Sequence, residues 1–239
     1  MRDRPGKTPI WKAIADALRS DLSEGRYRPG DKMPTEAALA QRFGVNRHTV
    51  RHGISALVND GLLRTRRGAG VFVAAVPTDY PIGRRVRFHE NLLAAGRMPE
   101  KRGLDIEERG ATQGEAEALD LAPGDLVCVY HSLSLGDGQP IAVSESLFPV
   151  ARLPGIGPAL VKTGSVTDAL TAVGVADYTR ASTRLTAVRA SATQALHLQV
   201  REGDPLLRSN GVNIDVQGRP VEYGRTWFAG DRITLTLEV

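Results

Sequence analysis

The chain has 239 residues, of which 41% are hydrophobic and 24% carry a charge. This ordinary globular mixture excludes a disordered or collagen-like chain, and the length suits one large domain or two modest ones. The longest apolar runs fall well short of the ~20 residues that a membrane helix needs, and no signal-peptide pattern follows the first methionine. A single cysteine and five histidines without ligand spacing predict a cytoplasmic protein with no disulfide, metal or other cofactor.

Positive charge is concentrated in the first third of the chain. Residues 1–75 hold 14 Lys and Arg against 7 Asp and Glu, whereas residues 76–239 hold 17 against 20. A basic segment on an acidic remainder indicates two domains, the first of which meets a polyanion.

Residues 9–44 predict two helices. Pro9 opens the first helix and Gly25 ends it. The apolar residues on one face of this helix, at spacings of three and four, are Trp11, Ile14, Leu18 and Leu22. Thr35 has the hydroxyl group that caps the second helix, and Gly44 ends it.

A third helix and a hairpin follow. Asn46 caps this helix, and its buried stripe consists of Val50, Ile54 and Leu57. The residues outside the stripe are Arg47, His48, Arg51, His52 and Ser55. Residues 62–66 and 71–73 are predicted strands, joined by a glycine-containing turn at 67–70. Three helices and a basic hairpin predict a winged helix-turn-helix.

A domain of this kind places the first turn of its third helix in the major groove of DNA. There an Arg side chain grips the O6 and N7 atoms of guanine, while the glycines of the hairpin let its backbone approach the duplex. The predicted DNA contacts are Thr35, Asn46, Arg47, His48, Thr49, Arg51, Arg66, Arg67 and Gly68. The alternative, a solvated basic helix pair, requires charge, helix order, turn and wing to coincide by accident.

Five motifs in residues 9–74 resemble the DNA-binding domain of GntR-type transcription regulators. They are PGDKMPTE (29–36), LAQRFGV (39–45), RHTVR (47–51), DGLL (60–63) and GAGVFV (68–73). The resemblance implies that Arg47, Thr49 and Arg51 on the third helix and Gly68 in the hairpin contact operator DNA. Many members carry an Arg directly after the Glu that starts the second helix. Ala37 stands there in this chain, so one expected contact is missing.

Residues 76–83 are predicted to be a short connector, and residues 84–239 contain an internal repeat. The repeated pairs are ALDL (118–121) with ALHL (195–198), GDL (124–126) with GDPL (203–206), and GQPI (138–141) with GRPV (218–221), at offsets of 77 to 80 residues. Each half is predicted to contain a short helix, a Gly-Asp turn and two strands joined by a hairpin. The first strands are 127–135 and 206–216, and their returns are 141–148 and 221–228. Together the halves predict one antiparallel sheet with helices on one side, an α+β domain.

This second domain resembles the effector-binding (UTRA) domain of the HutC branch of GntR regulators, which shares the chorismate-lyase fold. The markers are FHENL (88–92), Gly96, the two Gly-Asp turns, the two Gly-x-Pro hairpins, PG (154–155), PVE (220–222) and GDR (230–232). Within the branch, TDYP (78–81), RF (87–88), NLL (91–93) and VNRHT (45–49) are most similar to PhnF-type regulators of phosphonate uptake and breakdown.

The resemblance also bears on the effector site. In the HutC branch the Glu that matches Glu222 contacts the ligand; an exposed strand carboxylate is the alternative. Relatives that bind sugar phosphates carry two Arg where this chain has Ser132 and Ser134. These two serines share one face of a strand but carry no charge, which disfavours a sugar phosphate.

An anionic effector then requires other cations. The candidates are Arg87, Arg184 and Arg225, because Arg binds phosphate or phosphonate oxygens through two nitrogens. Each of them is alternatively a surface or ion-paired residue. Ser165 starts a predicted helix and is either an anion contact or only the helix cap.

Enzyme motifs are absent from the sequence: there is no Gly-x-Ser-x-Gly, His-Glu-x-x-His or Gly-x-x-x-x-Gly-Lys-Ser/Thr. We therefore expect a ligand-responsive repressor without enzymatic activity, which binds double-stranded operator DNA as a homodimer and responds to a small, anionic effector. Two alternatives stay open at this point. One is an enzyme that retains the chorismate-lyase fold, and the other is a DNA-binding protein whose second domain only dimerises.

Overall fold

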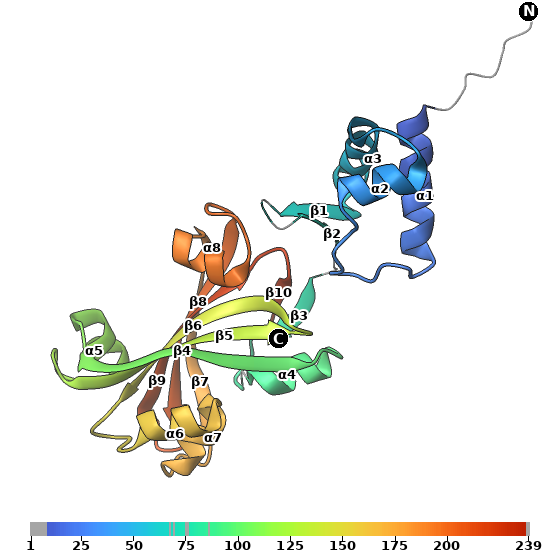
Figure 1. The fold of residues 1–239 in the computed structure, drawn as a ribbon. Coiled ribbons are helices and arrows are strands. Elements are labelled where there is room, and N and C mark those ends of the chain that lie inside the picture. The colour runs from blue at the N-terminus through green and yellow to red at the C-terminus, as the bar shows by residue number, and fades with distance from the viewer. Residues whose placement is uncertain (1–8, 67, 69, 75–76, 86, 238–239) are drawn as a thin grey trace, which may run out of the picture. The chain divides into compact units, whose positions relative to one another are not determined.

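The computed structural model describes residues 9–66, 68, 70–74, 77–85 and 87–237. The chain divides into two compact units, Met1–Val76 and Pro77–Val239, each of which has its own core (Figure 1). Within the described ranges, no helix is long and apolar enough to cross a membrane.

The first unit contains three helices and one hairpin. Its elements are α1 (Ile10–Ser23), α2 (Glu36–Phe43), α3 (Arg47–Asn59), β1 (Leu63–Arg66) and β2 (Gly70–Val73). Thr35 and Asn46 begin α2 and α3, because their side-chain oxygens accept hydrogen bonds from the backbone N–H groups of Ala38 (3.2 Å) and Thr49 (2.8 Å). Gly44 ends α2 in the left-handed conformation, with φ 64°.

The helices and the hairpin of this unit share one apolar core. Its buried residues are Ile14, Ala15, Leu18, Met33, Leu39, Val50, Ile54, Leu57, Leu63 and Val73. β1 and β2 pair in antiparallel fashion, and Lys32 forms a bridge to Phe72, so the segment before α2 lies along the hairpin. This arrangement confirms the predicted winged helix-turn-helix.

The second unit is built on one six-stranded sheet. Its elements are β3 (Thr78–Pro81), α4 (Phe88–Ala94), β4 (Pro99–Gly110), α5 (Gln113–Leu119), β5 (Leu126–Gly136), β6 (Gln139–Pro149), α6 (Ile156–Thr163), α7 (Val166–Ala172), β7 (Tyr178–Arg189), α8 (Ala192–Leu198), β8 (Pro205–Asp215), β9 (Pro220–Ala229) and β10 (Ile233–Thr236). The sheet is antiparallel throughout, in the order β4-β5-β6-β9-β8-β7. The internal repeat explains this order, because β4-β5-β6 and β7-β8-β9 are equivalent halves that meet where β6 pairs with β9.

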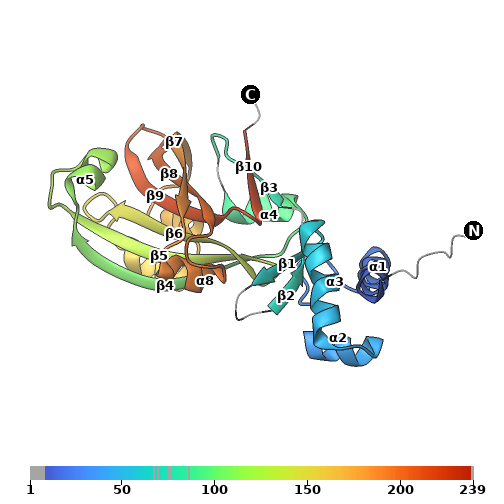
Figure 2. The same ribbon diagram turned by 90° about the horizontal axis from the view of Figure 1, so that it is seen from above.

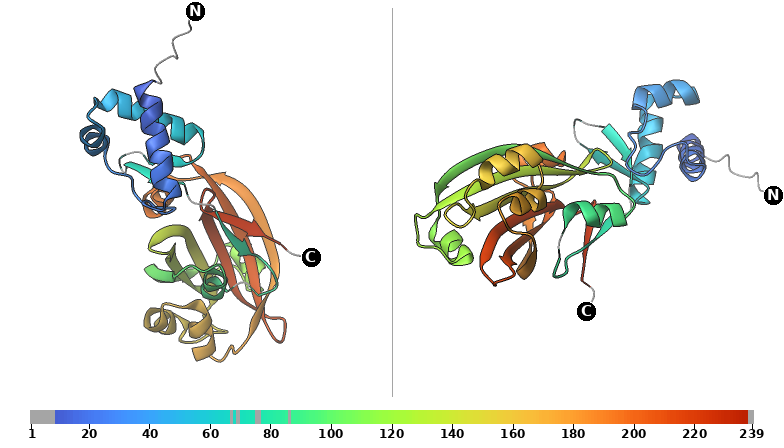
Figure 3. Two further views of the ribbon diagram at one scale, coloured as in Figure 1. Left: turned by 90° about the vertical axis from the view of Figure 1, so that its right-hand side faces the viewer. Right: turned by 90° about the horizontal axis from the view of Figure 1, so that it is seen from below.

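Helices cover both faces of the sheet, so the expectation of helices on one side was wrong. α5 and α8 pack on one face, against apolar residues such as Val129 and Leu133 of β5. α6 and α7 pack on the other face, against Tyr130 and Phe148. This second face also carries α4, beside Ala142 and the strands β3 and β10 (Figures 2 and 3). Because side chains alternate along a strand, each face needs its own cover.

Two other features of the second unit differ from the sequence prediction. Residues 78–81, expected within the connector, form β3, which pairs with β10 in parallel fashion. The long edge strands β4 and β7 were not predicted. Most of their residues are exposed, so they lack the apolar alternation that identifies a half-buried strand.

One glycine sets the packing of α1 on α3. A Cβ atom at Gly53 would lie 3.0 Å from the Trp11 carbonyl oxygen and 3.3 Å from Ile14 Cγ2. Both neighbours belong to the facing helix, and the nearer atom is backbone that cannot rotate away.

We therefore expect Gly53→Ala to destabilise the first unit, by about 1–2 kcal/mol. Overpacking costs about 1–3 kcal/mol, and the better helix propensity of Ala offsets up to ~1 kcal/mol of it. Hydrogen exchange of the α1 and α3 amides in the full-length chain measures this loss. Gly114→Ala in α5 is the matched control, since a Cβ atom there meets nothing within 4 Å. Equal protection of wild type and Gly53→Ala would contradict the packing described.

Candidate functional site

The first turn of α3 presents polar side chains at the surface. Arg47 and His48 are exposed, and Thr49 donates its backbone N–H and its hydroxyl to the Asn46 side-chain oxygen, at 2.8 and 2.9 Å. A shallow groove runs along this part of the helix, lined by Trp11, Asn46, His48, Thr49, Arg51, His52 and Ser55. Within the described residues Arg47 forms no hydrogen bond, so its guanidinium group is available to a partner.

Arg51 is held in place by a carboxylate of α2. Its Nε and Nη2 atoms donate to the two carboxylate oxygens of Glu36, at 2.9 and 2.7 Å. The hydrogen bonds from Arg51 lower the pKa of Glu36 below its ordinary value, and its charge adds to the effect. His52, on the next position, stacks on Trp11 of α1 with ring centroids 4.3 Å apart. The helix therefore carries one fixed and one free arginine, one turn apart.

The other predicted DNA contacts lie around this turn or in the hairpin. The hydroxyl oxygen of Thr35 is used as the α2 cap, beside Glu36. Gly68 is exposed in the hairpin turn, with φ 75°. The backbone of Arg66 is part of β1. The Arg66 side chain and the whole of Arg67 lie outside the described part of the chain.

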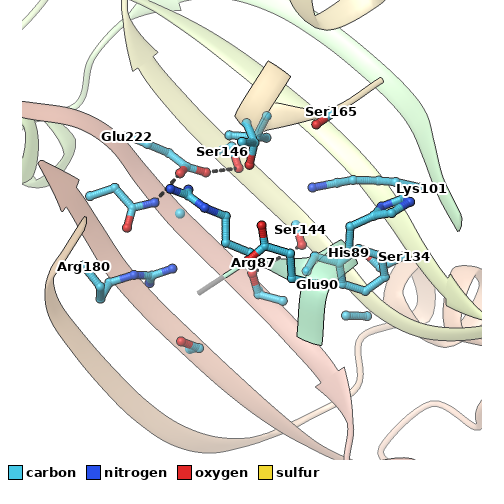
Figure 4. A pocket seen from close by; sticks show the side chains of 18 of the residues that line it. Arg87, His89, Glu90, Lys101, Ser134, Ser144, Ser146, Ser165, Arg180 and Glu222 are labelled. Carbon is cyan, nitrogen blue, oxygen red and sulfur yellow. Dashed lines mark hydrogen bonds between the residues drawn. The ribbon is translucent and has the colours of Figure 1, made fainter. Parts of the chain in front are cut away.

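The second unit contains a cavity of about 570 Å³ on the sheet face that carries α4, α6 and α7 (Figure 4). Strands β4 to β9 all contribute lining residues, as do α4 and the start of α7. The polar and charged residues among them are Arg87, His89, Glu90, Lys101, Ser134, Ser144, Ser146, Thr163, Ser165, Thr167, Asp168, Arg180, Thr183, Ser209, Asn213, Glu222 and Thr226. The volume suits a small metabolite.

Arg87 enters this cavity immediately before α4. Its guanidinium carbon lies 3.9 Å from the Tyr178 ring centroid, and its Nη2 donates to Asp177 at 3.2 Å. The side chain is only 12% exposed, and its Nη1 atom is buried without a hydrogen-bond partner. A buried donor without an acceptor is costly, so this atom is suited to donate a hydrogen bond to a ligand oxygen.

Two further cations reach into the cavity from the edge strands (Figure 4). Arg180 of β7 lies flat over Gly211 of β8: a Cβ atom on that glycine would lie 1.5 Å from Arg180 Nη1. The Arg180 Nε atom is buried and has no partner among the described residues. On the opposite edge, burial lowers the pKa of the Lys101 ammonium group, and the Glu222 carboxylate opposes that shift.

Glu222 is the buried carboxylate of the cavity, with 7% of its surface exposed. Ser146 donates to its Oε1 at 2.7 Å, and the Asn213 amide donates to its Oε2 at 2.5 Å. Both partners are neutral, so they fix the carboxylate in position without compensating its charge.

Four of the seven predicted effector residues lie at the cavity. Arg87, Ser134, Ser165 and Glu222 line the cavity. Ser165 also caps α7, accepting from the backbone N–H of Asp168 at 3.2 Å.

Ser132 does not line the cavity. It is fully buried, and its hydroxyl has no partner among the described residues.

Arg184 and Arg225 do not line the cavity, so both predictions were wrong. Their neighbours Thr183, Gly224 and Thr226 do line it, and adjacent residues of a strand point to opposite faces. Arg184 is exposed. The alternation also shows that Glu222 and Arg225, three positions apart, cannot both face one ligand.

Arg225 instead belongs to a network under α5. It donates to Glu145 at 2.6 Å and to Glu115 at 2.8 Å, and Arg109 also binds Glu115, at 2.7 Å. Hydrogen bonds from Arg109, the Thr112 backbone and Arg225 lower the pKa of the Glu115 carboxyl to about 2, although burial opposes this. The network therefore anchors α5 to the sheet.

Lys101 and Arg180 were missed by the sequence analysis. Both belong to the polar edge strands that were not predicted. The sequence nevertheless contained a sign that these two residues are equivalent. They are 79 residues apart, which falls within the range of offsets of the internal repeat.

Because the folded-state pKa of Glu115 lies below its ordinary value, its ionised form stabilises the unit above about pH 4.5. This contribution is lost as the pH falls towards about 2. We expect Glu115→Gln to lower the free energy of unfolding by about 1–3 kcal/mol at pH 7 and by progressively less below pH 4.5. Urea unfolding as a function of pH measures the difference, and Glu117→Gln, exposed on the same helix, is the control. A loss independent of pH would contradict the ionic role.

Comparisons with known proteins agree with the division of the chain. Residues 11–73 match the model of bacterial regulatory proteins of the gntR family, and residues 94–234 match that of the UTRA domain. An uncharacterized HTH-type transcriptional regulator of Rhizobium meliloti, RB1450, is 38% identical over 96% of this chain and 94% of its own length. The probable transcriptional regulator PhnF of Escherichia coli is 34% identical over 95% of this chain and 94% of its length. In fold, the crystal structure of PhnF from Mycobacterium smegmatis is similar, with a TM-score of 0.64, 24% identity, and coverage of 95% of this chain and 98% of that one.

Proposed function

The chain belongs to the GntR family of bacterial regulatory proteins and carries a UTRA domain, and we propose that it represses genes for the uptake or breakdown of a small anionic metabolite, with phosphonates as the first candidates. As a family member it is a transcriptional regulator and not an enzyme. The assignment of phosphonates draws on the relative named PhnF and on the cations of the cavity.

In this proposal the first unit binds operator DNA as part of a homodimer. The exposed first turn of α3 fits a major groove, and each of two recognition helices reads one half-site of a pseudo-palindrome. Arg47 is free to bind a base edge. Arg51, gripped by Glu36, is oriented before DNA arrives, which reduces the entropy lost on binding.

The second unit binds the effector, and the observation that carries this is the pair of unsatisfied guanidinium atoms in the cavity. Arg87 Nη1 and Arg180 Nε are both buried, and both lack an acceptor among the described residues. A phosphonate offers three oxygens in reach of forked Arg donors. A unit that served only to dimerise has no need for such a cavity.

The DNA-binding part of the proposal is tested on the two arginines of α3. We expect Arg47→Ala and Arg51→Ala each to weaken binding by about 1–3 kcal/mol, since each removes a base contact. Fluorescence anisotropy on a duplex selected by the full-length protein from a random pool measures the affinity. Lys162→Ala removes the same charge from the exposed surface of α6 and serves as the control. Unchanged affinity in both arginine variants would refute this orientation of α3.

The effector part is tested by thermal unfolding with methylphosphonate. A ligand that binds only the folded chain raises the melting temperature, and the effect grows with its concentration. We expect this rise in the wild type and its loss in Arg180→Gln. Arg184→Gln, on the same strand but facing away from the cavity, retains the rise. A shift that survives in Arg180→Gln would place the anion elsewhere.

A further inference from the structure

The internal repeat places a cation at the same position in both halves of the cavity. Lys101 of β4 pairs with Ser134 of β5, and Arg180 of β7 pairs with Asn213 of β8. The same 79-residue offset relates Lys101 to Arg180 and Ser134 to Asn213. All four residues line the cavity, so the duplication alone builds a site with a cation at each edge.

The cross-strand partners of Ser134 and Asn213 on the central strands β6 and β9 break this symmetry. Ser134 pairs with Ala142 of β6, whereas Asn213 pairs with Glu222 of β9. One half of the cavity therefore ends in a methyl group and the other in a carboxylate. The remaining carboxylates that line the cavity, Glu90 and Asp168, are exposed. Glu222 is thus the cavity's one buried negative group among the described residues.

Arg180 and Glu222 each lie near one of two paired glycines but do not form an ion pair with one another. Arg180 lies over Gly211, and Glu222 Oε1 would lie 3.5 Å from a Cβ atom on Gly224. These glycines are direct partners across β8 and β9, so no side chains project from the sheet at this pair. Nevertheless, among the described residues no cation lies within ion-pair distance of the Glu222 carboxylate, whose hydrogen bonds come from neutral donors.

We propose that the effector is a compact zwitterion, whose acid group binds Arg180, Arg87 and Lys101 and whose protonated amine binds Glu222. A purely anionic ligand would bring a second negative charge next to a buried carboxylate, which costs free energy. An amine at Glu222 removes that cost and gives the buried carboxylate a charged hydrogen-bond donor. This inference rests on the proposed function, because it names the class of effector for the same cavity.

Isothermal titration of the full-length protein with two matched probes tests the inference. In 2-aminoethylphosphonate an ammonium group stands where propylphosphonate has a methyl group, so the pair isolates the amine. We expect 2-aminoethylphosphonate to bind at least tenfold more tightly, because a charge-assisted hydrogen bond to a buried carboxylate is gained. β-Alanine, a carboxylate zwitterion, is the third probe, and tighter binding of β-alanine would support the zwitterion while refuting a phosphonate effector.

Substitution of Glu222 tests whether the amine of the ligand binds this carboxylate. Glu222→Gln is expected to bring the two phosphonates to nearly equal affinity, while Glu107→Gln, exposed on β4, keeps the preference. Thermal unfolding of the free Glu222→Gln protein establishes that it is folded. A preference that persists in Glu222→Gln overturns the inference.

Three outcomes separate this inference from the proposed function. If propylphosphonate binds the wild type as tightly as 2-aminoethylphosphonate, the zwitterion is refuted and the anionic effector stands. If both phosphonates bind and 2-aminoethylphosphonate binds at least tenfold more tightly, both stand. If no probe binds, both are refuted.

Discussion

The alternation of side chains along six antiparallel strands decides what the second unit can do. Residues of one parity face the helices α5 and α8 and build a closed core with the Glu115–Arg225 network. Residues of the other parity face a cavity in which two guanidinium atoms, Arg87 Nη1 and Arg180 Nε, lack acceptors among the described residues. A one-residue shift in the pairing of a strand would move its side chains to the opposite face of the sheet. The register of the strands therefore also determines which side chains a ligand meets. A bulge between Arg180 and Ser182 shifts this alternation in β7, so Arg180 lines the cavity whereas Arg184, four positions later, does not.

Gene duplication, recorded in the internal repeat, supplies the cavity with its framework. Two equivalent three-stranded halves meet at β6 and β9, and strands of both halves line the cavity. Differences between the halves then make the cavity asymmetric. Glu222 occupies the position that corresponds to Ala142, and Gly211 the position that corresponds to Ser132. Gly211 makes room for the Arg180 guanidinium. An asymmetric ligand is the natural complement of such a site.

The sequence predicts the first unit more completely than the second because its signals are local. Thr35, Gly44 and Asn46 mark helix ends through bonds within three residues of themselves, and the structure has those caps. The repeat likewise predicts β5, β6, β8 and β9. The sequence does not predict strands β4 and β7, because they are edge strands with mostly polar, exposed residues. They are stabilised by pairing with other strands, and not by a local sequence pattern. Two of the cavity's cations, Lys101 and Arg180, lie on these strands, so those residues were missed together with the strands.

Of the three arginines predicted from the sequence, Arg87 lines the cavity, whereas Arg184 and Arg225 do not. Nothing local distinguishes Arg225, bound to Glu115 and Glu145, from Arg87, which stacks on Tyr178. Their environments depend on which face of the sheet, or which helix end, each occupies. Parity within one strand was available from the sequence, and it separates Glu222 from Arg225 without a structure.

A ligand-responsive repressor requires that effector binding in the cavity of the second unit change the affinity of the first unit for DNA. A ligand shifts such an equilibrium only through different affinities for the DNA-competent and DNA-free states. The direct measurement is the affinity of the full-length protein for its selected duplex, with and without saturating 2-aminoethylphosphonate. We predict at least tenfold weaker DNA binding in the presence of the ligand for the wild type, and no change for Arg180→Gln. Equal affinities of the wild type with and without bound ligand would contradict the account.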